Sequence, residues 1–379
     1  MNLDSTLRAE LAALEQADLL RHLRPVDAPP LLNFAANDYL GLSRHPALIE
    51  AARRATADQG AGAGASRLVT GTIASALALE EELAAWKEKE AALVFSSGYA
   101  AALGTIPALV GKGDTVLLDK LAHASLIDGA RLSGATVRIF PHNQTARLES
   151  LLQKLSATPD RGRLLIVTES LFSMDGDTAP LRELVELKDR YGAWLLVDEA
   201  HATALYGITG AGLIAEAGIS AQVEIVMGTL SKALGSVGGY MAGSRVLIDW
   251  LVNRARSFVF STALPPGVIA ASRAAVALAR GPEGSALRTQ LRQNIAHFQA
   301  GLPVAWKQQP LSASAIQPLI CGESAAALHR SAALREQGFL IPAIRYPTVP
   351  RNAARLRITL NAAHATRDID ALNKALATT

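Results

Sequence analysis

The stretch that decides the fold is IVMGTLSKALGSVGGYMAG, residues 225–243. Its one charged residue is Lys232, and the neighbours of this lysine are small or apolar. Most lysines are solvated surface residues. Among such neighbours, however, the amine is expected to be partly desolvated, which favours the neutral, nucleophilic form. The segment therefore indicates a Schiff-base lysine, and its closely spaced glycines allow the chain to fold tightly around a bulky ligand.

Short apolar runs recur before this segment, with helical stretches between them. The runs are 92–95, 116–118, 137–140, 164–167, 194–197 and 224–227. Strands that alternate with helices predict an α/β fold with a mostly parallel sheet covered on both faces. In such sheets ligands bind outside the carboxyl ends of the strands. Four polar residues fall at or just beyond those ends: Asp119, Glu169, Asp198 and Thr229.

The alternation of apolar runs and helical stretches ends after Ser261. An Ala-rich helical stretch leads to the turn Gly281-Pro-Glu-Gly284. Beyond it, three runs look like strands of a smaller α+β domain: 315–320, 339–344 and 356–360. At the other end, Met1–Leu23 is expected to form an amphipathic helix. The predicted organisation is an N-terminal helix and arm (1–38), a large domain (39–280) and a small C-terminal α+β domain (281–379).

The composition excludes several classes of protein. The 379 residues include 37 basic and 34 acidic ones, without a block of like charges, and only 5% are aromatic. This balance argues against nucleic-acid binding. No run of about 18 apolar residues occurs, so a membrane-spanning helix is not expected. The single cysteine, Cys321, cannot form an internal disulfide, and we expect a cytoplasmic protein.

The tetrad Asp198-Glu-Ala-His201 matches a motif of nucleic-acid helicases. A helicase also needs a phosphate-binding loop of the form GxxxxGK[ST]. In Gly111-Lys-Gly113 the lysine is followed by glycine, and no glycine lies five positions before Gly111. The glycine-rich stretch 60–66 follows a helical stretch and contains no GxGxxG. The helicase interpretation therefore fails, and an Asp and a His that leave a strand end to hold an aromatic cofactor become the better interpretation.

Pyridoxal phosphate accounts for these parts together. Its ring nitrogen must stay protonated to act as an electron sink, and Asp198 at a strand end can hold that proton. His201 can bind the phenolic oxygen of the ring. The stretch Ser96–Ala100 follows a strand and opens a helix, where backbone amides can bind the phosphate. Each signal alone is more often a cap, a core histidine or an ordinary turn, but together with Lys232 they predict this cofactor.

Seven motifs then carry a resemblance to a known family: 33–42, Gly71-Thr72, 97–99, 123–125, 172–177, 197–201 and 228–232. With them the chain resembles the α-oxoamine synthases, a family of fold-type-I pyridoxal-phosphate enzymes, over nearly its whole length. Members condense an amino acid with an acyl thioester and then lose carbon dioxide. The resemblance implies a homodimer whose active sites lie at the subunit interface.

The resemblance also implies a role for each matched residue around the cofactor. Lys232 forms the Schiff base, Asp198 pairs with the pyridinium, and His123 stacks on the ring. The phenolic oxygen is flanked by His201 and Ser173. The phosphate is held by Gly98, Tyr99 and Thr229, with Ser261 reaching in from the partner subunit.

On the substrate side, the resemblance assigns the carboxylate of the amino acid to Arg357, with Arg355 as the competing candidate. His123 and Asn37 are also expected at the substrate. Three residues are expected near the acyl group: Arg21, Arg345 and Thr348.

Within the family, 314–320 and 343–350 favour L-alanine and a pimeloyl thioester, carried by coenzyme A or by a carrier protein. A relative that uses glycine with an acetyl or succinyl thioester would lack the second stretch. A non-catalytic subunit of this fold would have lost Lys232. Two positions depart from the family pattern: Tyr346 stands where proline is usual, and Ala204 where glycine is frequent.

Overall fold

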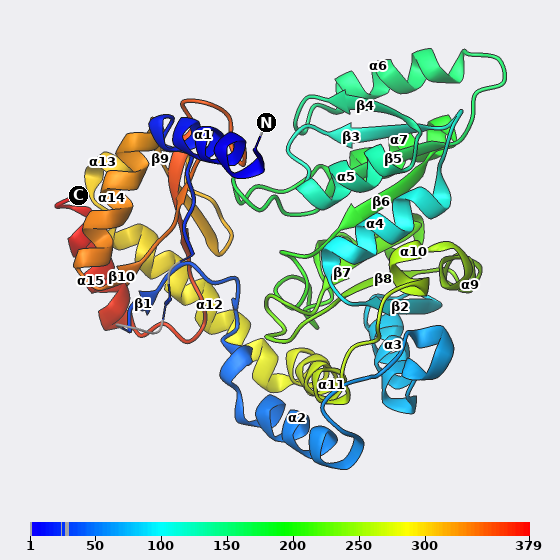
Figure 1. Cartoon of the computed structure of the whole chain (residues 1–379), viewed down its shortest axis with the longest axis horizontal. Helices are drawn as coiled ribbons and strands as arrows, with labels where there is room; N and C mark the ends of the chain where they lie inside the picture. The colour runs from blue at the N-terminus through cyan, green and yellow to red at the C-terminus, as the bar shows by residue number, and fades with distance from the viewer. Residues whose placement is uncertain (1, 24, 27–29) are drawn as a thin grey trace. The chain divides into compact units, whose positions relative to one another are not determined.

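The computed structural model describes residues 2–23, 25–26 and 30–379 (Figure 1). These residues form two compact units. The larger unit comprises 38–173 and 177–289, and the smaller one comprises 174–176, 290–379 and the described residues before 38. The turn at Gly281 lies between helices α11 and α12, and the units divide after Thr289, within α12. The three-part division at 38 and 280 stays a prediction.

The larger unit contains a seven-stranded sheet with the order β2-β8-β7-β6-β5-β3-β4 (Figure 1). Its strands are β2 (Ala91–Phe95), β3 (Thr115–Asp119), β4 (Thr136–Phe140), β5 (Leu164–Glu169), β6 (Trp194–Asp198), β7 (Ile225–Thr229) and β8 (Gly239–Gly243). Strands β3 to β7 pair in parallel, and β8 runs antiparallel to both β2 and β7. The predicted α/β fold with a mostly parallel sheet is confirmed. The glycine-rich strand β8 was not expected.

The main core of this unit lies between the sheet and four helices: α4 (Gly98–Leu109), α5 (Ala124–Leu132), α9 (Arg245–Arg254) and α10 (Arg256–Val259). Buried side chains of this core include Leu118, Val167, Leu196, Met227, Ile106, Leu126 and Phe258. Each such side chain contributes about 1.5–3 kcal/mol when fully buried. The carboxyl ends of the strands are therefore anchored in a tightly packed layer.

The remaining helices of the larger unit pack around this sheet and against one another. They are α2 (Pro46–Gln59), α3 (Ala74–Trp86), α6 (Thr145–Ser156), α7 (Leu181–Tyr191), α8 (Leu213–Glu216) and α11 (Pro266–Arg280). Short helical turns occupy Leu42–Arg44, Arg67–Gly71 and Ser220–Gln222. Helix α11 contacts α2 and α3, α3 contacts β2, and α7 contacts β6.

The smaller unit holds a three-stranded antiparallel sheet, β11-β12-β9, and a parallel pair, β1-β10. The strands are β1 (Leu32–Asn33), β9 (Ile316–Gly322), β10 (Phe339–Leu340), β11 (Ala343–Ile344) and β12 (Ala354–Thr359). The helices are α1 (Leu3–Gln16), α12 (Pro282–Gly301, which begins in the larger unit), α13 (Val304–Lys307), α14 (Ser324–Glu336) and α15 (Thr366–Leu376).

Two sequence-based expectations for this unit were wrong in detail. The run 339–344 was expected as one strand, but it forms β10 and β11 in different sheets. Pro342 lies between them and lacks the N–H that a continuous ladder requires. The amphipathic helix expected over Met1–Leu23 ends at Gln16, before Asp18 with its positive φ of 56°.

Among the described residues, no helix is long and apolar enough to cross a membrane.

Candidate active site

The polar residues expected at the carboxyl ends of the strands lie there. Asp119 ends β3, Glu169 ends β5, Asp198 ends β6 and Thr229 ends β7. All four are buried. This edge of a parallel sheet is where α/β proteins bind ligands.

A cavity of about 740 Å³ lies at the opposite end of the same strands. It is lined by Trp194 and Ile225, the first residues of β6 and β7, and by Trp250. It includes none of the polar residues at the carboxyl ends. The convergence of polar groups, and not the size of a cavity, therefore identifies the candidate active site.

Lys232 belongs to a hydrogen-bonded chain of three side chains. Its Nζ lies 2.7 Å from Nε2 of His201, and Nδ1 of His201 lies 2.5 Å from Oη of Tyr39. Lys232 is half-buried, whereas His201 and Tyr39 are fully buried. An ammonium at Lys232 would donate to Nε2 and leave the imidazole proton on Nδ1, facing Tyr39. The structure thus joins the two residues predicted from the sequence, and it adds Tyr39, which lies in the matched stretch 33–42 but had no assigned role.

The surroundings of Asp198 have opposing effects on the stability of its ionised form. Its side chain is buried, and Oδ1 accepts a 2.8 Å hydrogen bond from the backbone N–H of Ala200. Burial raises the pKa of the Asp198 carboxyl, while the positive charge of Lys232, the Ala200 N–H and His123 lower it. The carboxylate is thus available to a cationic partner.

His123 is the N-cap residue of α5. Its Nδ1 accepts a 3.2 Å hydrogen bond from the backbone N–H of Ser125, so the proton of the neutral ring resides on Nε2. Burial lowers the pKa of His123, and Lys232 lowers it further, although the nearby Asp198 and Asp128 raise it. At neutral pH His123 is therefore a neutral, flat ring, which suits stacking on an aromatic ligand.

The N-terminus of α4 has features that favour binding of an anion. Gly98 is its first residue, and the side chain of the N-cap residue Ser97 accepts the N–H of Ala100 at 3.0 Å. A Cβ added to Gly98 would lie 3.8 Å from Cβ of Thr229, so the helix start and the end of β7 adjoin. Thr229 donates its Oγ1 proton to the carbonyl of Gly238 at 2.8 Å. Backbone N–H groups and the helix dipole at this point favour a phosphate.

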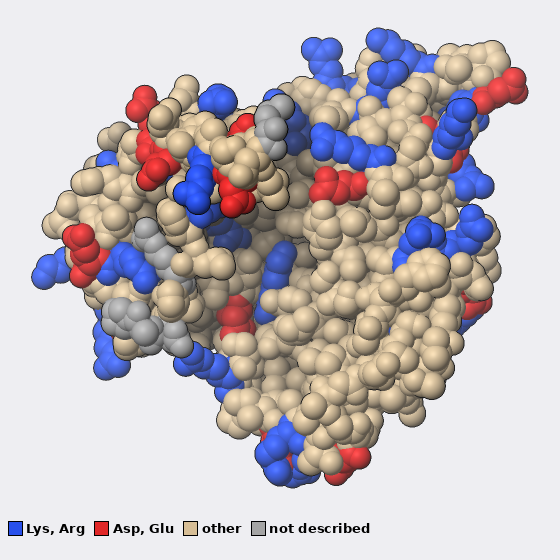
Figure 2. Space-filling view, in the orientation of Figure 1, with Lys and Arg blue, Asp and Glu red and all other residues tan. Residues whose placement is uncertain are grey.

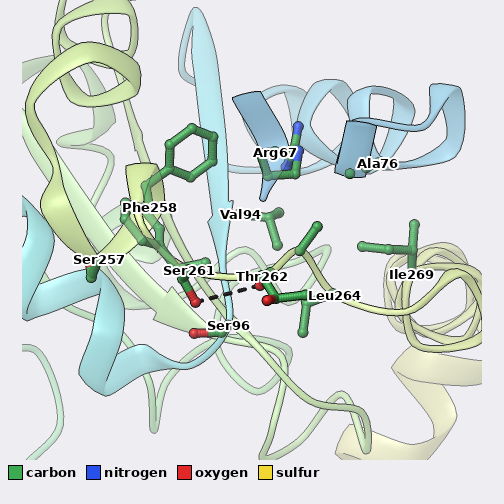
Figure 3. A pocket seen from close by; sticks show the side chains of 13 residues that line it. Arg67, Ala76, Val94, Ser96, Ser257, Phe258, Ser261, Thr262, Leu264 and Ile269 are labelled. Carbon is green, nitrogen blue, oxygen red and sulfur yellow. Dashed lines mark hydrogen bonds between the residues drawn. The ribbon is translucent and has the colours of Figure 1, made fainter. Parts of the chain in front are cut away.

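Three other residues predicted to bind the cofactor also lie in the larger unit, but their contacts do not indicate a specific role. Tyr99 is exposed, and its Oη donates to Asp128 at 2.5 Å, which raises the pKa of the phenol. Ser173 is buried in the segment that follows β5. Ser261 lines a small cavity of about 20 Å³ with Ser96 (Figure 3). Their roles at the cofactor stay predictions.

Two arginines on β12 in the smaller unit differ in their partners. Arg355 forms an ion pair with Asp175, with Nη1 and Oδ1 2.6 Å apart. Nη1 of Arg357 instead donates to neutral oxygens, Oδ1 of Asn37 and Oγ1 of Thr359, both at 3.0 Å. Both arginines are buried. Arg355 is already paired with a carboxylate of the chain, which makes it the weaker candidate for the carboxylate of a substrate.

The residues expected near the acyl group meet elsewhere in the smaller unit. Arg345 donates to the backbone carbonyls of Asp18 and Leu20, the latter at 3.4 Å. Burial lowers the pKa of Arg345, and the charge of Arg21 lowers it further, so the two guanidinium groups are neighbours. The backbone N–H of Thr348 donates to the carbonyl of Arg345 at 3.0 Å. The structure thus brings these three predicted residues together.

On the face shown in Figure 2, Lys and Arg side chains of the described residues are interspersed with acidic ones and do not form one continuous patch. This face offers no stripe of positive charge that would follow a nucleic-acid backbone.

Comparison with known proteins places the chain in a family. The family model for aminotransferase class I and II matches residues 29–376. The 8-amino-7-oxononanoate synthase of Geobacter metallireducens is 51% identical over 344 residues, which cover 91% of this chain and 87% of that protein. The 8-amino-7-oxononanoate synthase of Geobacter sulfurreducens is 46% identical over 382 residues, which cover 98% and 97%. The chain belongs to the 8-amino-7-oxononanoate synthase family.

Solved structures agree with this assignment. A serine palmitoyltransferase from S. paucimobilis with a bound PLP–myriocin aldimine superposes with a TM-score of 0.90 at 27% identity, covering 100% of this chain and 98% of that one. An 8-amino-7-oxononanoate synthase from Francisella tularensis superposes with a TM-score of 0.75 at 28% identity, covering 92% and 97%. The predicted enzyme class, a pyridoxal-phosphate-dependent acyltransferase, is confirmed.

The residues at the carboxyl ends of the strands fit pyridoxal phosphate. Lys232 offers an amine, Asp198 offers a buried carboxylate, and α4 offers N–H groups beginning at Gly98. The cofactor itself supplies an electron sink that stabilises negative charge on a carbon bonded to its imine nitrogen.

Proposed function

We propose that the enzyme condenses L-alanine with a pimeloyl thioester to give 8-amino-7-oxononanoate, carbon dioxide and a free thiol, a step of biotin synthesis in the cytoplasm. The observation that carries this proposal is the 46–51% identity to relatives of that name over nearly the whole chain. The retention of Lys232 beside His201 supports a catalytic chain, since a non-catalytic subunit has no use for this amine.

In this proposal Lys232 would hold the cofactor, and its amine would take the proton from the alanine Cα. Nε2 of His201, 2.7 Å from Nζ, lies in reach to share that proton. Asp198 keeps the ring nitrogen protonated, as a buried carboxylate beside a cation does. His123 covers the ring face as a neutral imidazole, and His201 and Ser173 bind the phenolic oxygen.

Arg357 orients alanine by its carboxylate. A guanidinium can take a carboxylate in two parallel hydrogen bonds, which sets the torsion about the Cα–N bond. Only a bond perpendicular to the cofactor ring overlaps its π system. The Cα–H bond must take that position first, and the bond to the carboxylate must take it after condensation. The contacts of Arg357 with Asn37 and Thr359 support this role because they fix the orientation of the guanidinium.

The anionic parts of the cofactor and the acyl substrate have separate binding groups in this proposal. The phosphate is held by Gly98, Tyr99 and Thr229, with Ser261 contributed by a partner subunit. Arg21 and Arg345, with Thr348 beside them, supply positive charge for the acyl substrate. A pimeloyl group ends in a carboxylate and coenzyme A carries phosphates, so both parts of the thioester would be attracted by two neighbouring guanidinium groups.

We also propose that the enzyme is a homodimer. Apolar side chains that a monomer would expose support this: Val69 and Phe260 are 74% and 71% exposed, and Leu3 of α1 is 71% exposed. The three other leucines of α1, Leu7, Leu11 and Leu14, are exposed as well. Exposed apolar surface of this kind is typical of an interface.

A substrate matrix tests the proposed reaction. L-alanine, glycine and L-serine are each incubated with pimeloyl-CoA, pimeloyl-carrier protein, acetyl-CoA, succinyl-CoA and palmitoyl-CoA, and the products are identified by mass. We expect product from alanine with a pimeloyl thioester, and the two pimeloyl donors show which carrier is used. Faster condensation of glycine with acetyl-CoA or succinyl-CoA, or of serine with palmitoyl-CoA, would contradict the proposal. Serine and palmitoyl-CoA are included because the chain superposes well on serine palmitoyltransferases.

A further inference from the structure

A second buried carboxyl lies beside Asp198. Glu169 is the last residue of β5, and it pairs in register with Asp198 at the end of β6. Adjacent strands lie about 4.8 Å apart, and residues paired in register in parallel strands point to the same face. Both side chains are buried, with 2% and 4% of their surfaces exposed. The sheet therefore holds two carboxyl groups side by side, away from water.

The surroundings of the two carboxyls are unequal. Burial raises the pKa of Glu169 to about 8, and the charges of Asp198 and of Asp119 on β3 raise it too. Lys232 after β7 and the backbone N–H of His123 lower the pKa of Glu169, but they do not cancel the effect of burial. The carboxylate of Asp198 is stabilised by the N–H of Ala200 and by Lys232 and His123, all of which lower its pKa. Ionising both carboxyls would place two negative charges side by side in the protein interior, which raises the free energy. The two groups therefore titrate together, and the pair carries one proton.

The hydrogen bonding of Glu169 indicates where that proton lies. Its Oε1 is buried and has no hydrogen-bond partner among the described residues. An ionised oxygen without a donor is costly in the interior, whereas a protonated carboxyl needs less compensation. Oδ1 of Asp198, in contrast, receives the N–H of Ala200 at 2.8 Å. Glu169 is therefore the carboxyl of the pair that leaves a buried oxygen without a donor, and it is the better place for the proton.

We propose that Glu169 is a positioning residue that carries the one proton of the Glu169–Asp198 pair, so that the single negative charge rests on Asp198. This inference deepens the proposed function, because it rests on the role of Asp198 at the ring nitrogen of the cofactor. A charge shared between the two carboxyls would be displaced from that nitrogen toward β5. Glu169 thus directs the charge without contacting the reacting atoms.

Infrared spectroscopy of the full-length chain tests the location of the proton, with the cofactor bound and after its removal. At pH 7 we expect a C=O band of a protonated, buried carboxyl that shifts on 13C-labelling of glutamate and not of aspartate. The band should fade as the pH rises through about 8. Labelling needs no substitution, so it is informative even where a variant does not fold.

Two near-isosteric variants assign the band. Glu169→Gln should abolish it, and Asp198→Asn should leave a protonated glutamate in place. A band that responds to aspartate labelling, or that persists in Glu169→Gln and disappears in Asp198→Asn, would overturn the proposal because the proton would then reside on Asp198. Absence of any protonated carboxyl band at pH 7 would overturn it as well.

The pH profile of the holoenzyme supplies a readout that a purely structural role would not change. At pH 6–7 Glu169→Gln should keep kcat/KM within about threefold of wild type, because a neutral side chain replaces a neutral one. Above about pH 8 the wild-type profile and its visible spectrum should change with the ionisation of Glu169, and those of Glu169→Gln should lack that step. Identical profiles would contradict the inference. If the substrate matrix gave no pimeloyl condensation, the proposed function would fail while the infrared result on the carboxyl pair would stand.

Discussion

The charged groups at the strand ends of the larger unit and those on β12 of the smaller unit are compensated differently. Asp198 and Glu169 are adjacent carboxyls whose pKa values are both raised by burial. On β12, Arg355 is neutralised by Asp175 at 2.6 Å, and Arg357 donates to the neutral oxygens of two side chains. The first cluster holds adjacent carboxyls with raised pKa values, whereas the second sets its guanidinium groups against oxygen acceptors.

This difference suits the two clusters to different functions, acid–base chemistry and carboxylate binding. A cluster with shifted pKa values can hold and release protons near neutral pH, as acid–base chemistry requires. A guanidinium fixed by neutral acceptors keeps its charge and its orientation, as carboxylate binding requires. Changes at the strand ends should therefore affect rate and pH dependence, and changes on β12 should affect affinity and stability.

Replacing Lys232 with Ala should have the largest effect. In the proposed mechanism this amine binds the cofactor covalently and takes the Cα proton, so turnover should be abolished and the visible absorbance of the enzyme should disappear. Lys232 is half-buried at a strand-end loop, so the fold should stay intact by circular dichroism. Condensation of alanine at a near wild-type rate would remove Lys232 from the mechanism.

Replacing Asp198 with Asn should come next. The amide keeps the shape of the side chain but removes the charge that, in the proposed mechanism, holds the ring proton. Loss of such an electrostatic partner costs about 2.7–4 kcal/mol, or ~100–1,000-fold in kcat. As a control, Asp175→Asn removes a carboxylate from the β12 cluster and should leave the spectrum of the cofactor unchanged. A loss below about tenfold (~1.4 kcal/mol) in Asp198→Asn would show that this residue is not the pyridinium partner.

The β12 pair should give a smaller and more selective effect. Arg357→Lys keeps the charge but loses the planar fork, so the Kd for alanine should rise by about tenfold for each ~1.4 kcal/mol lost. The matched change Arg355→Lys should leave the alanine Kd unchanged and lower the Tm, because it disturbs the pair with Asp175. Alanine titrations followed by the cofactor spectrum measure both. The reverse pattern would assign the substrate carboxylate to Arg355.

The smallest effect concerns a backbone position of the larger unit. Ala204 is fully buried and has a positive φ of 70°, a conformation that costs a non-glycine residue about 1–2 kcal/mol. Ala204→Gly relieves this strain but adds about 0.5–1 kcal/mol of unfolded-state entropy. We expect a net gain between zero and ~1.5 kcal/mol with unchanged kinetics. Ala202→Gly, at a buried position outside the positive-φ set, should instead destabilise the fold. Thermal unfolding of both variants would decide.

The strand-end chemistry was largely predictable because strands, turns and their following residues are adjacent in sequence. Apolar runs located β2 to β7, and the residues that follow them located Asp198, Thr229 and the start of α4. The left-handed backbone at Ala204 suits the glycine that the family resemblance led us to expect at this position. Strand β8 was missed because its glycines have low strand propensity, and it forms through pairing with β2 and β7.

The partners of the site residues could not be predicted in the same way. Tyr39 reaches His201 across 162 positions, and Asp175 reaches Arg355 across 180. Such contacts depend on packing that no local pattern encodes. Pro342 did carry a local signal, the missing N–H, and it should have divided the run 339–344.

By itself the sequence determined the α/β class and the cofactor and proposed the residues that bind it, because these inferences follow from short motifs whose chemistry is local. Only the tertiary structure showed that Arg355 pairs with Asp175, a contact that distinguishes it from Arg357, the chemically identical residue two positions away on the same strand. Only the tertiary structure placed Glu169 beside Asp198, because strand order and register bring together carboxyls that are 29 residues apart in the chain. The protonation and the partner of an ionisable side chain depend on the groups near it in space. The folded protein supplies these groups and the low-dielectric interior in which they interact.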